Sequence, residues 1–67
     1  MINTTCNDQP TTVYITDDCV YAIYDNDPDS DIFFHVEIDD PSLDLRDELE
    51  NEFDLETVEF IFREFGI

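Results

Sequence analysis

Four aspartates with one residue between each pair occupy the segment DNDPDSD: Asp25, Asp27, Asp29 and Asp31. This spacing is that of the first oxygen ligands in a calcium-binding loop, which also requires a glycine at its sixth position and a glutamate at its twelfth. The chain has Ser30 and Val36 at those two positions. We therefore expect no dedicated metal site, and interpret the four acids as an exposed loop, with a weak divalent-ion site as the alternative.

His35 and Glu37 are two residues apart, so on a strand both side chains lie on one face, as a general acid and base would. Catalysis also needs a nucleophile, a cation that stabilises negative charge, and a pocket, and no motif in the sequence places them beside this pair. The only glycine is Gly66, so glycine-rich nucleotide-binding motifs are excluded. We expect His35 to be a surface histidine and the protein not to be an enzyme.

Cys6 and Cys19 are the only cysteines and, with the lone His35, are too few for a zinc site. Two cysteines without a secretion signal more often remain reduced, so we expect free thiols and no cofactor. The sequence has no basic start followed by an apolar stretch, and no apolar run of about 18 residues. A cytoplasmic location is the expectation.

Three segments, 11–16, 19–24 and 32–38, alternate in the manner of strands. If Asp17 and Asp18 form the first turn, Ile15 pairs with Val20 and Val13 with Ala22. Residues 1–10 are polar and unpatterned, which predicts a loosely ordered N-terminal arm before a β-meander over 11–38. Alternation assigns Val13, Ile15, Val20, Ala22, Tyr24, Ile32, Phe34, Val36 and Ile38 to the core face, and Tyr14, Cys19, Tyr21, Ile23 and Phe33 to the other face.

Residues 40–66 are predicted to form two helices. Asp40 or Ser42 is expected to cap the first, which runs to about Phe53 because an apolar residue recurs every four positions. Asp54 is expected to cap the second, which ends at Gly66. Its apolar stripe consists of Leu55, Val58, Ile61, Phe62 and Phe65. The expected fold is a single α+β domain over 1–67, a three-stranded antiparallel sheet followed by two helices packed on one face.

The chain carries 19 Asp and Glu against two Arg and no Lys, a net charge of −17, although 42% of it is hydrophobic. Disordered chains are poor in large apolar residues, so this one is expected to fold despite its self-repulsion. Solubility needs a charge of only about 2 to 8 in a small domain. An excess this large therefore indicates a basic partner.

Nucleic acid is the polymer with comparable charge density. At about one charge per 1.7 Å, the chain's charge of −17 matches roughly 29 Å of duplex DNA, against a diameter of roughly 28 Å expected for a compact domain of this length. In the first helix, Asp44 and Glu48, and Glu48 and Glu52, are like-charge pairs that cost about 0.2 to 0.5 kcal/mol each. This pattern favours an interaction surface over a merely solvated helix.

In size, charge and the acidic segments DLRDELENEFDLE and DNDPDSD, the chain resembles the small acidic inhibitors, encoded by phages and mobile elements, that mimic double-stranded DNA to block bacterial defence. The resemblance implies an anti-CRISPR protein that binds the basic groove where DNA enters a type I CRISPR surveillance complex. Exposure, rather than a motif, selects the partner-binding acids: Asp25, Asp27, Asp29, Asp31, Glu37, Asp44, Asp47, Glu48, Glu50 and Glu52.

Two other functions remain open: an anti-restriction DNA mimic, and an antitoxin-like inhibitor of a basic protein that involves no DNA mimicry. The aromatic face with Tyr14, Tyr21 and Phe33 also has three interpretations. The N-terminal arm covers it, two copies pair through it as a homodimer, or it contacts the target protein. In every case we expect neither nucleic-acid binding nor membrane binding, because both surfaces would repel this chain.

Overall fold

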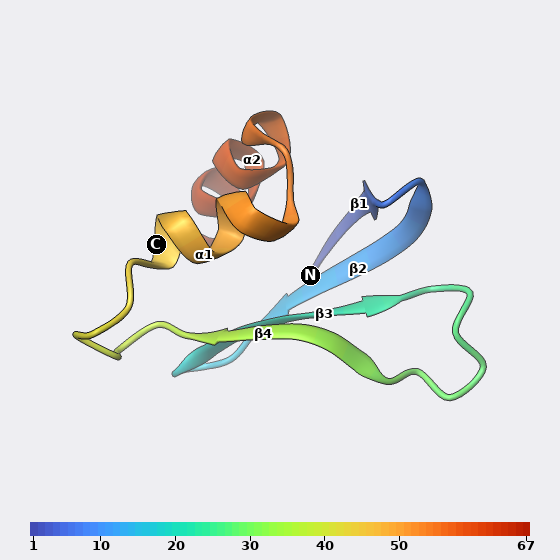
Figure 1. The fold of residues 1–67 in the computed structure, drawn as a ribbon, viewed down its shortest axis with the longest axis horizontal. Helices are drawn as coiled ribbons and strands as arrows, with labels where there is room; N and C mark the ends of the chain where they lie inside the picture. Colours follow the sequence, from blue (N-terminus) through green and yellow to red (C-terminus); the bar gives the residue numbers. More distant parts are fainter.

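The structure is a computed structural model that describes all of residues 1–67. Its fold consists of four strands followed by two helices (Figure 1). The elements are β1 (Ile2–Cys6), β2 (Gln9–Ile15), β3 (Cys19–Tyr24), β4 (Ile32–Glu37), α1 (Leu45–Glu52) and α2 (Leu55–Phe65). The strands form one antiparallel sheet in the order β1-β2-β3-β4. The α+β class is thus confirmed, but the sheet has four strands rather than the predicted three.

The additional strand comes from the segment that was predicted to be a loose arm. Asn7 and Asp8 have φ of 53° and 63°, so they form a two-residue turn between Cys6 and Gln9, which are paired. Asn and Asp tolerate this left-handed conformation better than most residues, and such turns match the twist of a hairpin. Ile2 and Cys6 are buried on the core side of β1. The strand is hard to predict because these two are its only apolar residues.

The predicted pairing of β2 with β3 is confirmed. Val13 lies opposite Ala22 and Ile15 opposite Val20, with Thr16 and Cys19 closing the Asp17-Asp18 turn through a backbone hydrogen bond of 2.8 Å. Val13, Val20 and Ala22 are fully buried. Alternation alone was sufficient here because the turn is short and both strands are regular.

A β-bulge changes the faces at the start of β4. Ala22 pairs with Phe34 but Ile23 pairs with Ile32, which leaves Phe33 as the extra residue. Ile32 is consequently 53% exposed, whereas Phe33 packs against the core and stacks on Tyr24 at a ring-centroid distance of 3.9 Å. The predicted faces of Ile32 and Phe33 are therefore wrong, and Phe33 does not belong to the aromatic surface with Tyr14 and Tyr21.

Helix α1 begins later than predicted. Asp44, not Asp40 or Ser42, is its N-cap, and the Asp44 carboxylate accepts hydrogen bonds from the Arg46 and Asp47 backbone amides at 3.1 and 3.4 Å. Asp40 instead accepts hydrogen bonds from the amide and hydroxyl of Ser42 and holds the preceding turn. A local turn thus competes with the helix for the Asp40 side chain.

Helix α2 has the predicted ends. Asp54 caps it by accepting a 2.9 Å hydrogen bond from the Thr57 amide, and Gly66 closes it with φ of 69°. Val58 and Ile61 are fully buried, as the predicted apolar stripe requires, but Leu55, which was predicted to belong to that stripe, is 62% exposed, so this part of the prediction is wrong.

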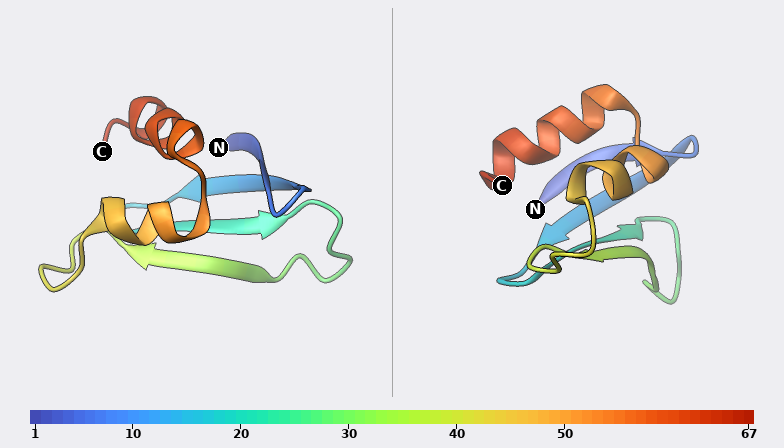
Figure 2. Two further views of the ribbon diagram at one scale, coloured as in Figure 1. Left: turned by 45° about the horizontal axis from the view of Figure 1, so that its top comes forward. Right: turned by 60° about the vertical axis from the view of Figure 1, so that its left-hand side comes forward.

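Both helices lie on the same side of the sheet (Figure 2), α1 next to β4 and α2 next to β1. A single cluster of buried side chains joins the two layers: Ile2, Cys6, Val13, Val20, Ala22, Val36, Leu49, Phe53, Val58 and Ile61. The molecule has a radius of gyration of 11.3 Å and extends 34 × 23 × 19 Å. Neither helix is long and apolar enough to span a lipid bilayer.

Candidate interaction surface

Three carboxylates from three different elements surround a hollow of about 220 Å³ beside α1. Glu37 comes from the last position of β4, Asp40 from the turn that follows, and Glu48 from the middle of α1. His35, Val36 and Leu43 complete the lining. The β4–α1 turn, which Asp40 and Ser42 hold in place, therefore brings strand and helix acids to one site.

A second hollow of about 340 Å³ lies at the other end of α1. Its carboxylates are Asp8 from the β1–β2 turn, Glu52 from the last position of α1, and Asp54 from the cap of α2. The rest of the lining is Thr5, Cys6, Asn7 and Phe53. The two-residue turn at Asn7-Asp8 places an acid from the N-terminal hairpin beside the junction of the helices.

The two hollows share no lining residue, but Glu48 of the first and Glu52 of the second are one turn apart on the same face of α1. Four residues of helix rise about 6 Å. We call the six acids that line the two hollows the acidic band: Asp8, Glu37, Asp40, Glu48, Glu52 and Asp54. Neither arginine lines either hollow, and the one basic side chain in the lining is that of His35.

Local hydrogen bonds keep two of these acids ionised. Those donated by Ser42 lower the pKa of Asp40, and those from Thr57 lower the pKa of Asp54. Burial raises the pKa of the Cys6 thiol, and the charges of Glu52 and Asp54 raise it further. Asp40 and Asp54 thus stay ionised below neutral pH, while Cys6 remains a protonated thiol that donates to the Glu52 carbonyl at 3.4 Å.

Cys6 and Cys19 are both free thiols. Cys6 is buried in the core, whereas Cys19 pairs with Glu37 and alternates with Val20, which places it on the opposite face of the sheet. The sheet itself separates the two sulfur atoms.

Of the predicted partner-binding acids, Glu37, Glu48 and Glu52 belong to the acidic band. Glu50 does not, because it forms an ion pair of 3.4 Å with Arg46, whose guanidinium lies over the Phe62 ring. Asp44 caps α1, and Asp47 is exposed on α1 but lines neither hollow. The acids of α1 therefore fall into different groups.

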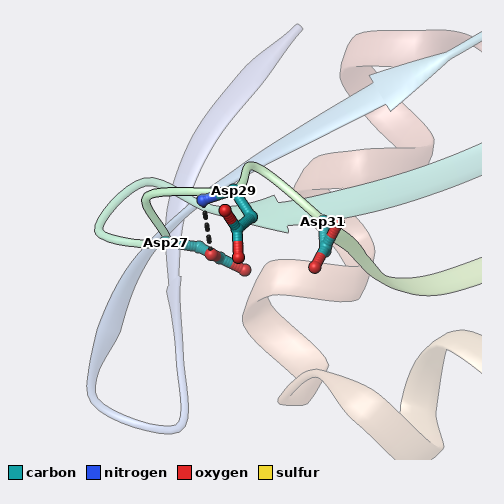
Figure 3. Close-up of side chains that lie close together, drawn as sticks. All are labelled: Asp27, Asp29 and Asp31. Atoms are coloured by element: carbon teal, nitrogen blue, oxygen red, sulfur yellow. Dashed lines mark hydrogen bonds between the residues drawn. The ribbon is translucent and has the colours of Figure 1, made fainter.

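The predicted loop acids form a separate cluster between β3 and β4. Carboxylate oxygens of Asp27, Asp29 and Asp31 lie within 4.8 Å of one another (Figure 3), and the Asp29 amide donates to the Asp27 carboxylate at 2.9 Å. Asp25 instead accepts a hydrogen bond from the Thr12 hydroxyl. Three carboxylates offer oxygen ligands of the kind that divalent cations take. The cluster lies at the opposite end of β4 from Glu37, apart from the acidic band.

The sequence interpretation missed Asp8, Asp40 and Asp54 as surface acids. Asp40 and Asp54 were expected only as helix caps, and Asp8 fell in the segment predicted to be an arm. The Asn7-Asp8 pair was the available signal, since these residues favour a hairpin turn. The proximity of Asp8 to Asp54 depends on the packing of β1 near α2 and has no local signal.

Comparisons with protein-family models, with curated protein sequences and with solved structures found no match to this chain.

Proposed function

We propose that this chain is an anti-CRISPR protein that mimics double-stranded DNA. It binds the basic groove where DNA enters a type I CRISPR surveillance complex and thereby blocks binding of the target DNA. The observation that supports the proposal best is the acidic band, in which six carboxylates from strand, turns and helices line two hollows at the two ends of α1 and no arginine lines either hollow.

The mechanism is competitive occupation. Carboxylates of the band take the positions of phosphates and accept charge-assisted hydrogen bonds from Arg and Lys of the groove. Because the acids project from a packed scaffold, little conformational entropy is lost on binding. The 34 Å length of the molecule is also close to the roughly 29 Å of duplex that carries 17 charges.

The partner is a basic nucleic-acid-binding protein in the cytoplasm of a bacterial host. The chain itself binds neither nucleic acid nor an anionic membrane, because its net charge of −17 opposes both. Affinity for the partner falls steeply as salt is added, since the complex depends on charge neutralisation.

A charge reversal confined to the acidic band tests the proposal. The triple variant Glu37→Lys, Glu48→Lys and Glu52→Lys is expected to lose inhibition of DNA binding by a purified type I complex. The control is Glu56→Lys, Glu59→Lys and Glu64→Lys, in which exposed glutamates of α2 are replaced and the net charge changes by the same amount. The control is expected to keep most of its inhibition.

Circular dichroism establishes that both variants remain folded. If the band variant inhibits as well as the unchanged protein, the band is not the binding surface. If the two variants lose inhibition equally, total charge rather than the position of the acids determines binding, and the mimicry proposal fails.

A further inference from the structure

The face of the sheet opposite the helices is covered by no other element (Figure 2). Tyr14, Tyr21 and His35 form one row across β2, β3 and β4, and Ile23 and Ile32 lie in the next row. We call these five residues the open face. The Tyr14 and Tyr21 rings are stacked, with centroids 5.2 Å apart and planes 15° from parallel.

One occupant of the open face is excluded by the fold. The N-terminal segment is strand β1 within the sheet, paired with β2, so it does not cover Tyr14 and Tyr21 as an arm. Tyr14, Tyr21 and Ile23 are only partly buried and Ile32 is 53% exposed, so their outer sides remain accessible.

Charge opposes a second copy as the occupant. Asp17 and Asp18 form the turn at one end of the open face, and Asp25 and Asp31 flank the other end. Glu37 pairs with Cys19 of β3 and lies on the same face of β4 as His35. Two copies that met through this face would bring identical acids together, and each copy carries a charge of −17. A cationic partner, in contrast, is attracted to every side of the face.

Stacked tyrosines bordered by carboxylates suit arginine in particular. A guanidinium lies flat on an aromatic ring and donates in-plane hydrogen bonds to carboxylates, whereas an ammonium group is a compact and strongly hydrated charge. Glu37 also lines the first hollow of the acidic band, so the open face and the band meet at the edge of β4. One basic surface can therefore contact both.

We infer that the open face docks arginine side chains of the partner, with guanidinium groups stacked on Tyr14 and Tyr21 and hydrogen-bonded to the surrounding acids. The inference rests on the proposed function in that the partner is a basic protein. It adds a preference for arginine over lysine that depends on the two tyrosine rings, beyond the preference that bidentate pairing with carboxylates gives.

The test uses the full-length chain with two peptide probes, ten arginines and ten lysines, at physiological salt. We expect the arginine peptide to bind about two- to fivefold more tightly, the factor that one exposed cation–π contact supplies. Tyr14→Thr with Tyr21→Thr removes both rings but keeps a residue that favours strands. This variant should show a difference between the peptides that is smaller by about that factor, and Tyr14→Phe with Tyr21→Phe should retain the full difference.

Equal binding of the two peptides by the unchanged protein, or a difference that is the same in the threonine variant, overturns the inference. So does a wild-type dimer in sedimentation that the threonine variant does not form, because the occupant is then a second copy. If the threonine variant does not fold, amide chemical shifts of the unchanged protein decide. Shifts in β2 and β3 specific to the arginine peptide support the inference, and their absence rejects it.

The same titrations separate this inference from the proposed function. If the Glu37, Glu48 and Glu52 triple variant binds the lysine peptide as well as the unchanged protein does, the band is not a cation-binding surface, whatever the tyrosine variants show. If the triple variant loses binding of the lysine peptide but the unchanged protein shows no preference for arginine, the acidic band is a cation-binding surface and the inference about the open face is rejected.

Discussion

Individual aspartates of this chain serve different purposes although they share one chemistry. Asp44 and Asp54 cap helices, and Asp40 holds a turn, each by accepting hydrogen bonds from nearby backbone amides. Such residues satisfy donors that the first turn of a helix leaves free. Part of the acidity is therefore required by the fold itself, and counting acids does not identify the partner-binding residues.

Asp54 provides a pH-dependent test at this scale. Its pKa is lowered in the fold by the hydrogen bonds from Thr57, so it stabilises the protein above the unfolded pKa of about 3.9. That stabilisation is lost as pH falls through the lower folded pKa. Asp54→Ala should therefore reduce the urea midpoint at pH 7, and the reduction should shrink as pH falls below about 4.

Asp17→Ala is the matched control, because it also removes one exposed carboxylate but no helix cap. It relieves the same amount of net charge. A reduction at pH 7 that is equal in both variants, or one that does not change with pH, would contradict the capping role of Asp54.

The helix caps show what local sequence predicts and what it does not. Asp54 and Gly66 follow from residue type and position, and the structure confirms both. Asp40 looked equally suitable as a cap, yet its carboxylate is used by Ser42 and the helix starts four residues later. Whether Asp40 or Asp44 caps the helix depends on the path that the chain takes from β4, and the local sequence pattern does not determine that path.

At the scale of elements, the same limit applies to the sheet. The β2–β3 hairpin could be predicted because strict alternation and a two-residue turn fix its register. The bulge at Phe33 could not, because an extra residue leaves the composition of β4 unchanged while exchanging the faces of Ile32 and Phe33. Strand β1 was missed because three consecutive amide and hydroxyl side chains separate its only two apolar residues, both buried.

Two leucines of the helices give an element-scale prediction. Leu49 is fully buried between α1 and the sheet, so Leu49→Ala should lower the free energy of unfolding by about 2 to 5 kcal/mol. Leu55 is 62% exposed at the start of α2, so Leu55→Ala should change the free energy of unfolding by no more than about 0.5 kcal/mol. Urea denaturation followed by circular dichroism measures both.

A chain of 67 residues is stable by only roughly 3 to 10 kcal/mol, so Leu49→Ala should leave a substantial unfolded population. Similar losses in the two variants would mean that Leu55 contributes to the core and that the face of α2 is assigned incorrectly. Conversely, an unaffected Leu49→Ala variant would show that α1 does not pack on the sheet.

At the scale of the whole molecule, many of the acids fall into separate groups. The acidic band follows α1 from β4 to the β1–β2 turn, the aspartate loop lies at the other end of β4, and the ion pair of Arg46 with Glu50 is separate from both. Composition predicts a folded and strongly anionic particle. Tertiary packing determines which acids lie close together, and composition does not predict this grouping.

Competition with DNA tests the mimicry proposal most directly. Labelled duplex DNA is titrated into a purified type I CRISPR surveillance complex at several fixed concentrations of this protein, and binding is followed by fluorescence anisotropy. We expect the apparent Kd for DNA to rise in proportion to the protein concentration, with full DNA binding restored at saturation. A complex that holds this protein and duplex DNA at the same time would contradict mimicry.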